Sequence, residues 1–231
     1  MSALLNLEGI SKRFGYLDIL ENINFSINSG EFVMLVGNNG AGKSTLLRII
    51  TSLMRPTKGE IFFQGTNQKD ILKTWFKKMG YISEENRFYG DLSPIDNLRL
   101  YGSLYQTEKI NYKIGEILSK IDLNHVAELP VRNFSSGMKK RLMIGRLMLY
   151  EPEILLLDEP YGGLDRISFR WFQSYLREFK DRGGTIIMVT HQFELGLELA
   201  NRVVVLHKKK IMHDMQAEEL NLDNLSAWLE E

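Results

Sequence analysis

The stretch Gly37-Asn-Asn-Gly-Ala-Gly-Lys-Ser-Thr45 (GNNGAGKST) decides the fold of this chain. It follows an apolar run from Phe32 to Val36 and leads into Leu46-Leu-Arg-Ile-Ile50. Glycines let a backbone wrap closely around a ligand and adopt positive φ. The amides of such a loop point inward, and the positive N-terminal end of the following helix faces the same place. The stretch therefore indicates a phosphate-binding loop between a strand and a helix.

The motif within the stretch is G-x-x-x-x-G-K-[ST], carried by Gly37, Gly42, Lys43 and Ser44. In this motif the lysine reaches the β- and γ-phosphates, and the serine hydroxyl reaches Mg²⁺. A glycine-rich turn without a ligand is the alternative, but the position between a strand and a helix disfavours it. We therefore predict that the loop, called here the phosphate loop, binds a nucleoside triphosphate with its magnesium. The predicted contacts are Gly37, Asn38, Asn39, Gly40, Ala41, Gly42, Lys43, Ser44 and Thr45.

Composition excludes several classes of protein. The 231 residues carry 29 basic and 29 acidic side chains, so no global field recruits nucleic acid or an anionic membrane. The chain has no cysteine, which excludes a disulfide framework and a thiolate metal site. No apolar run approaches the ~20 residues needed to cross a bilayer. We expect a protein that is soluble by itself, has no nucleic-acid partner, and reaches a membrane only through a partner protein.

Hydrophobic patterning predicts buried strands that alternate with helices. Residues 154–157 and 185–189 are unbroken apolar runs, as expected of strands that are covered on both faces. Ser93-Pro94-Ile95-Asp96 combines a cap residue, a first-turn proline and an early acid, which indicates a helix start. A helix-rich segment, about 86–150, thus interrupts an α/β chain. Such a chain forms a doubly wound sheet whose ligands bind at the carboxyl ends of the strands.

A second candidate site ends the strand Ile154-Leu-Leu-Leu-Asp-Glu-Pro160 with two consecutive carboxylates. Asp158 can hold the magnesium through water, and Glu159 can polarise the attacking water. An ordinary acidic turn is the alternative, and the presence of a phosphate loop disfavours it because the chemistry needs both parts.

Five further positions accompany these two motifs along the chain: Phe14, Glu84, residues 134–138 (FSSGM), residues 161–165 (YGGLD) and His191. Taken in order, the seven resemble the ATP-binding subunit of ATP-binding-cassette (ABC) transporters, from about Leu4 to the hairpin near Ile211. The resemblance implies an α/β P-loop NTPase core with an antiparallel β subdomain and an inserted α-helical subdomain. It also implies a single ABC ATPase domain over residues 1–231. Its parts would be core lobes at about 1–85 and 151–215, the helical subdomain at about 86–150, and a tail at about 216–231.

The resemblance assigns roles to residues outside the phosphate loop. Phe14 falls where the family stacks an aromatic ring on adenine, and Glu84 falls at the Q-loop glutamine that reaches magnesium. Residues 134–138 (FSSGM) are similar to the family signature LSGGQ and are called here the signature loop. Residues 161–165 (YGGLD) correspond to the D-loop, and His191 corresponds to the switch histidine.

The implied mechanism pairs two subunits head to tail, so that ATP lies between the phosphate loop of one and the signature loop of the other. Glu159 would be the general base, and His191 and Lys43 would act on the γ-phosphate. Asp165 would form part of the contact between subunits. The implied signature contacts are Ser135, Ser136, Gly137 and Met138. The implied magnesium ligands are Ser44, Glu84 and Asp158.

Three residues depart from the family pattern. Glu84 stands where glutamine is usual, Ser136 replaces a glycine, and Met138 replaces a glutamine. The Ser136 side chain raises the question of whether the loop can still approach a ligand closely. With Lys139-Lys-Arg141, the segment resembles the SxGMKxR pattern of ABC exporters, which favours export.

We therefore predict an ATPase that drives a separate integral membrane protein, dimerises on ATP, and lies at the cytoplasmic face of the cell membrane. The second subunit is predicted to be another copy, although a similar chain fits the pattern too. One alternative is a soluble ABC ATPase acting on ribosomes or DNA, although such relatives usually carry two cassettes or a long coiled coil. Another is a clamp that binds ATP but scarcely hydrolyses it. The cargo would be determined by the membrane partner.

Overall fold

The computed structural model describes residues 3–83, 88–220, 225 and 228. Its strands are β1 (Leu5–Phe14), β2 (Leu17–Ile27), β3 (Phe32–Val36), β4 (Lys58–Phe63), β5 (Thr66–Asn67), β6 (Met79–Ile82), β7 (Ile154–Asp158), β8 (Thr185–Val189), β9 (Arg202–His207) and β10 (Lys210–Gln216). Its α-helices are α1 (Lys43–Ile50), α2 (Leu72–Lys78), α3 (Pro94–Tyr105), α4 (Ile110–Lys120), α5 (Ser136–Met148), α6 (Arg166–Asp181) and α7 (Phe193–Leu197).

The larger sheet places the site-bearing strands side by side, in the order β10-β9-β3-β8-β7-β6. Every pairing in it is parallel except that of β10 with β9. The two unbroken apolar runs become β7 and β8, in which every residue is buried, as predicted. Because neighbouring parallel strands share a direction, the carboxyl ends of β3, β7 and β8 meet at one edge of the sheet.

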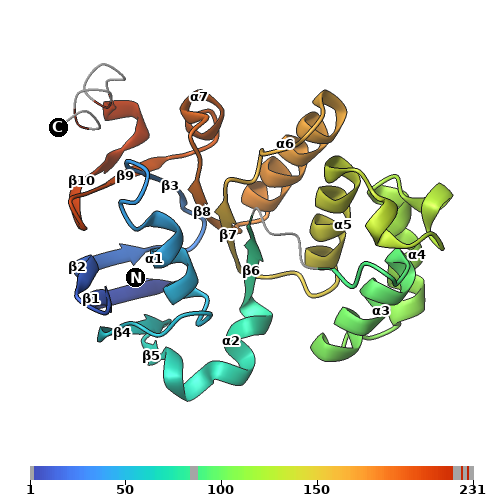
Figure 1. Ribbon diagram of the computed structural model, residues 1–231, viewed down its shortest axis with the longest axis horizontal. Coiled ribbons are helices and arrows are strands. Elements are labelled where there is room, and N and C mark those ends of the chain that lie inside the picture. Colours follow the sequence, from blue (N-terminus) through green and yellow to red (C-terminus); the bar gives the residue numbers. More distant parts are fainter. Residues whose placement is uncertain (1–2, 84–87, 221–224, 226–227, 229–231) are drawn as a thin grey trace.

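A smaller antiparallel sheet, in the order β2-β1-β4-β5, faces the larger one across α1 (Figure 1). Leu46, Leu47, Ile49 and Ile50 of α1 are buried in a core shared with both sheets. The opposite face of the larger sheet is covered by α5 and α6. The predicted α/β core with an antiparallel β subdomain is therefore confirmed.

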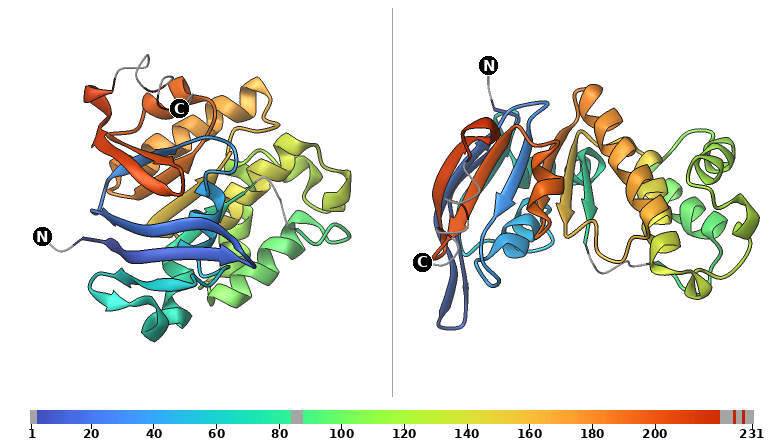
Figure 2. Two further views of the ribbon diagram at one scale, coloured as in Figure 1. Left: turned by 60° about the vertical axis from the view of Figure 1, so that its left-hand side comes forward. Right: turned by 90° about the horizontal axis from the view of Figure 1, so that it is seen from above.

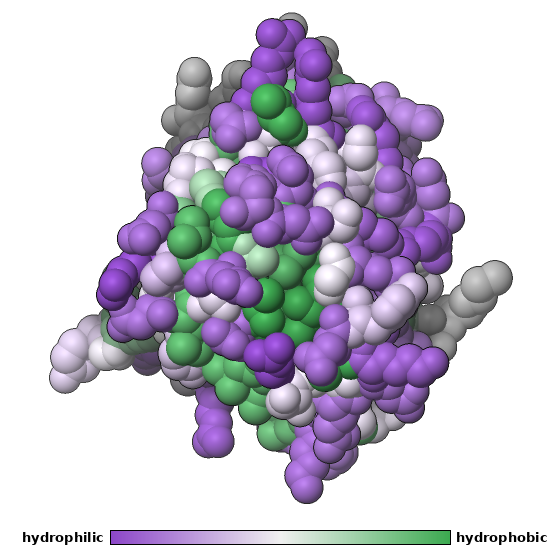
Figure 3. All heavy atoms as spheres, turned by 90° about the vertical axis from the view of Figure 1, so that its right-hand side faces the viewer, coloured by the Kyte–Doolittle hydropathy of each residue, from purple (hydrophilic) through white to green (hydrophobic). Residues whose placement is uncertain are grey.

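The inserted helices α3 and α4 pack with α5 around a core of their own, which includes Leu98, Ile114 and Leu142. Seen from above, they lie at the end of the molecule farthest from the antiparallel sheet (Figure 2). The face that this end presents gathers apolar side chains among hydrophilic ones (Figure 3). The predicted inserted helical subdomain is thus present, with its helices between residues 94 and 148.

In the tail, Leu225 is buried against Met34 and Val205. The Trp228 ring stacks on His213, with ring centroids 3.9 Å apart. These two residues of the tail therefore pack on the core lobe. Among the described helices, none combines the length and the apolar character that crossing a membrane requires.

Candidate nucleotide site

The phosphate loop connects β3 to α1, and two of its glycines are required by close contacts. A Cβ atom at Gly37 would lie 2.2 Å from the Leu206 carbonyl oxygen. At Gly42, which precedes α1 with φ 102°, a Cβ atom would lie 2.7 Å from the Leu20 side chain. Any other residue would therefore push the loop away from β9 or β2. The motif glycines are needed to hold the loop in place as well as to admit a ligand.

Lys43 begins α1 and folds back across the loop. Its Nζ donates to the carbonyl oxygens of Gly37 at 2.6 Å and Asn38 at 3.0 Å. Burial lowers the pKa of Lys43, and the nearby carboxylates of Glu159 and Asp158 oppose that shift. The ammonium group is thus held at the mouth of the loop, where a phosphate chain would meet it.

Ser44 and Asp158 join the phosphate loop to the end of β7. The Ser44 hydroxyl donates to Asp158 Oδ1 at 2.9 Å, and the Tyr81 hydroxyl donates to Oδ2 at 3.4 Å. Burial and the Asp158 charge raise the pKa of Tyr81, so its hydroxyl keeps its proton. Sequence reasoning missed Tyr81, because nothing in the sequence indicates that β6 lies next to β7.

Glu159 follows β7 and faces His191, which follows β8. Glu159 has φ 49°, a strained conformation for a residue with a side chain, and such strain gathers at functional sites. Its amide donates to the Val189 carbonyl at 2.9 Å, and its Oε2 accepts from the His191 amide at 3.3 Å. His191 Nε2 lies 3.5 Å from Oε1. The strained turn therefore directs the Glu159 carboxylate toward His191.

The two carboxylate oxygens of Glu159 are not equally satisfied. Within the described part of the chain, Oε1 is buried and accepts no hydrogen bond. Burial raises the pKa of Glu159, although the His191 amide partly offsets that effect. A partly buried carboxylate with a free acceptor and a raised pKa has the properties of a general base for a water molecule.

These residues surround one cavity of about 300 Å³. Phe14 lies at its edge and is half exposed, with Lys12 Nζ 4.8 Å from the ring centroid. The sequence did not indicate Lys12 or Ile19, which also lines the cavity. The predicted residues that line it are Phe14, Asn39, Gly40, Gly42, Lys43, Ser44, Thr45, Asp158, Glu159 and His191.

Magnesium suits the donors at this point. The Ser44 hydroxyl and the Asp158 carboxylate are hard oxygen ligands, and Mg²⁺ is usually bound by one or two carboxylates together with substrate phosphates. No group of three or more histidine, aspartate or glutamate side chains able to hold a metal occurs among the described residues. Glu84, the third predicted ligand, lies outside the described residues.

The signature loop lies elsewhere, at the N-terminus of α5. Ser135 and Ser136 are exposed, and neither Gly137 nor Met138 lines the cavity of the phosphate loop. Asp165 caps α6 beside them by accepting hydrogen bonds from the amides of Ile167 at 3.0 Å and Ser168 at 2.8 Å. One chain thus brings together the phosphate loop, the two carboxylates and His191, but it leaves the signature loop apart from them.

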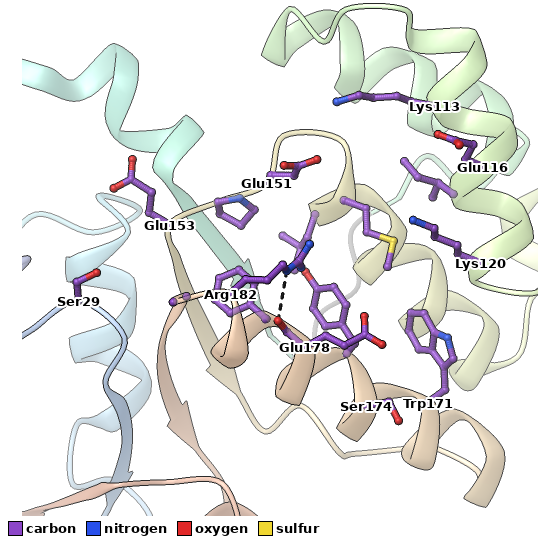
Figure 4. A pocket seen from close by; sticks show the side chains of 18 of the residues that line it. Ser29, Lys113, Glu116, Lys120, Glu151, Glu153, Trp171, Ser174, Glu178 and Arg182 are labelled. Atoms are coloured by element: carbon purple, nitrogen blue, oxygen red, sulfur yellow. Dashed lines mark hydrogen bonds between the residues drawn. The ribbon is translucent and has the colours of Figure 1, made fainter.

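A different and larger hollow has a volume of about 910 Å³ (Figure 4). It lies between α4 and α6 and is lined by Glu153 and Gly184, which precede β7 and β8. It therefore opens at the amino ends of the strands, opposite the edge that holds Asp158 and His191.

Comparison with known proteins identifies the family of this chain. Residues 20–162 match the family model described as ABC transporter. The lantibiotic transport ATP-binding protein SrtF of Streptococcus pyogenes is 34% identical over 211 residues, covering 90% of this chain and 89% of its own. The sulfate/thiosulfate import ATP-binding protein CysA 1 of Agrobacterium fabrum is also 34% identical, over 90% of this chain and 62% of its own length.

Among solved structures, the ATP-binding subunit of an ABC transporter superposes with a TM-score of 0.89 at 28% identity, covering 99% of this chain and 100% of that one. The relatives include both a lantibiotic transport protein and an import protein. The expectation of export therefore has no support from the relatives as a group.

Proposed function

The chain belongs to the ABC transporter family, and from that premise we propose that it is the subunit that binds and hydrolyses ATP to drive a separate membrane-spanning partner. The contact between Ser44 and Asp158 carries this proposal, because it joins the phosphate loop to the strand that ends in the general base. Both parts of a phosphoryl-transfer site are thereby held in one cavity.

In this mechanism the phosphate loop binds the triphosphate through its amides and the start of α1. Lys43 neutralises charge on the β- and γ-phosphates. Ser44 and Asp158 would hold magnesium, which when bound shields the charge of the phosphate oxygens. Glu159 takes a proton from the attacking water, which His191 helps to orient. Phosphoryl transfer depends on positioning and charge neutralisation more than on covalent chemistry, so these few groups suffice on this side of the nucleotide.

The other side of the nucleotide needs a second chain. The exposed Ser135 of the signature loop offers a hydroxyl donor at a helix N-terminus, which is an anion-binding arrangement, but it does not reach the cavity in its own chain. In a head-to-tail pair the signature loop would cover the triphosphate of the other copy. Ile167, which follows Asp165, is 78% exposed and would be covered in such a pair.

A second groove, of about 500 Å³, suits the membrane partner. It is lined by residues of α2, β6 and α5, with Leu53 and Phe76 exposed at its edge. Arg48 and Arg146 line it too, and no carboxylate does so among the described residues. A short amphipathic helix with an acidic side chain fits this combination. Ser83, which follows β6, also lines the groove.

Peripheral attachment to the cytoplasmic face of a membrane, and export as the direction of transport, belong to this proposal. Export is favoured by the SxGMKxR-like segment at residues 135–141. The import function in the name of CysA 1 is the competing observation.

The test is purification of the tagged chain from detergent-solubilised membranes of its own organism. We expect an integral membrane protein to co-purify, and we expect the complex to hydrolyse ATP. Phe76→Asp in the groove should abolish co-purification, whereas Ser174→Ala on the exposed side of α6 should not. Recovery of soluble partners alone would reject the transporter role in favour of a soluble ABC ATPase. A complex that binds ATP without turnover would favour the nucleotide-gated clamp.

A further inference from the structure

The signature loop and the D-loop contact each other within one chain. The Ser136 hydroxyl donates to the Gly163 carbonyl oxygen at 2.7 Å. Gly163 has φ 71°, and a Cβ atom there would lie 3.3 Å from both Cβ and Oγ of Ser136. A glycine with positive φ therefore lets the D-loop approach the serine closely enough for this bond. The hydrogen bond joins residues that are 27 positions apart.

A second contact beside the first brings the starts of α5 and α6 together. A Cβ atom at Gly137 would lie 2.9 Å from Asp165 Oδ2 and 3.2 Å from the Ser168 hydroxyl. The Asp165 carboxylate thus caps α6 and also lies against the N-terminus of α5, where negative charge is favourable. The hydrogen bonds from Ser168 lower the pKa of Asp165, so it stays charged.

The two serines of the signature loop use their hydroxyl groups differently. Ser135 Oγ accepts from the Met138 amide at 3.2 Å, and a hydroxyl that accepts still has its own proton to donate. The Ser136 hydroxyl, in contrast, donates its proton to Gly163. Ser135 is therefore available to a phosphate, whereas the donor of Ser136 is already engaged inside its own chain.

We propose that Ser136 is a positioning residue, whose hydroxyl joins the signature loop to the D-loop so that both loops close on the facing copy as one unit. The inference rests on the proposed function, because it needs a head-to-tail pair. Ser136 acts through Gly163 and touches no reacting atom. The Ser136 side chain stands where the family has glycine. In this proposal it holds the signature loop in place and does not obstruct its approach to the nucleotide.

The test compares Ser136→Ala, Ser136→Gly and Ser136→Thr in the Glu159→Gln background, with Ser174→Ala as the matched control. Loss of one hydrogen bond should raise the ATP concentration for half-maximal pairing about 3- to 10-fold in the alanine and glycine variants. Threonine keeps the hydroxyl and should restore pairing. Nucleotide binding to a single copy, measured at a dilution where no pairs form, should stay unchanged in all four variants.

Each outcome separates this inference from the proposed function. Pairing in Ser136→Ala and Ser136→Gly that matches the parent would overturn the role of Ser136 and leave the function standing. If the Ser136 variants also lost nucleotide binding to a single copy, the positioning role would be overturned as well, because the serine would then be needed for the folding of the chain in general. If the Glu159→Gln parent itself does not pair with ATP, the proposed function fails, and this inference fails with it.

Discussion

The phosphate loop and the signature loop use the same physical device, but they differ in what surrounds it. Each loop precedes a helix and offers donors at the helix N-terminus. Lys43 is 7% exposed and bound to two carbonyls, and Ser44 is bound to Asp158. Ser135 and Ser136, in contrast, lie on the surface. The phosphate loop, together with Asp158, Glu159 and His191, is called here the finished half of the site. The signature loop has the features of the half that would complete the site of a second copy.

The difference has an energetic reason. Donors buried without a partner cost free energy, so the phosphate loop satisfies its lysine internally until a nucleotide arrives. Donors at the surface are solvated by water and need no such arrangement. The phosphate loop can therefore be preorganised in one chain, whereas in the proposed pair the signature loop would lose its water only when two chains meet.

The largest effect is expected at the finished half. Replacing Glu159 by Gln removes the base but keeps its shape, so turnover should fall about 10²- to 10⁴-fold while ATP is retained. The closed pair should then accumulate, and size-exclusion chromatography with ATP would detect it. Glu178→Gln, on α6 beside the large hollow at the opposite edge of the sheet, is the control and should behave as wild type. Unchanged turnover in Glu159→Gln would contradict the assignment.

Mixed pairs test whether the two halves belong to different copies. Lys43→Ala and Ser135→Ala carried by separate copies put both defects into one composite site and leave the other intact. When one copy carries both changes and its partner is wild type, each of the two composite sites contains one defect. Because each change removes a bond to charged phosphate, we expect turnover about tenfold or more higher in the first arrangement. Equal turnover in the two arrangements would argue for a site completed within one chain.

The pH dependence of ATP turnover tests the protonation of Glu159 in the finished half. The carboxylate is the active form of Glu159, so turnover at saturating ATP should fall as pH drops through its pKa. Burial raises that pKa, and the fall should therefore begin at a higher pH than for an exposed glutamate. The attraction of His191 works in the opposite direction, so His191→Ala should move the fall to still higher pH. A profile that falls only in the ordinary carboxyl range would contradict the effect of burial.

The smallest effect is expected at Tyr81. Its hydroxyl lies 3.4 Å from Asp158 Oδ2, which is a long hydrogen bond. Tyr81→Phe should therefore raise the Mg²⁺ concentration for half-maximal turnover only about 2- to 5-fold. Tyr112→Phe, on the exposed face of α4, is the matched control. A magnesium dependence identical to wild type would show that the hydroxyl has no part in orienting Asp158.

Much of the finished half could be predicted from the sequence because its motifs are short. Nine consecutive residues determine the phosphate loop, and two consecutive carboxylates follow a buried strand. Tyr81 could not be found in this way, because its contact depends on β6 pairing with β7. The arrangement of Ser136 against Gly163 depends on how α5 and α6 pack, which no local pattern indicates.

The sequence by itself therefore determined the phosphate-loop motif, the buried parallel strands, and the two consecutive carboxylates at the end of β7, from which the roles proposed for Asp158 and Glu159 follow. Only the tertiary structure decided that Asp158 receives both Ser44 and Tyr81, that the strained turn at Glu159 points to His191, and that the signature loop leans on the D-loop. The physical reason is the separation along the chain of the residues that interact. Backbone conformation and hydrophobic period are local properties of a chain, whereas contacts between distant segments depend on which surfaces pack together to exclude water.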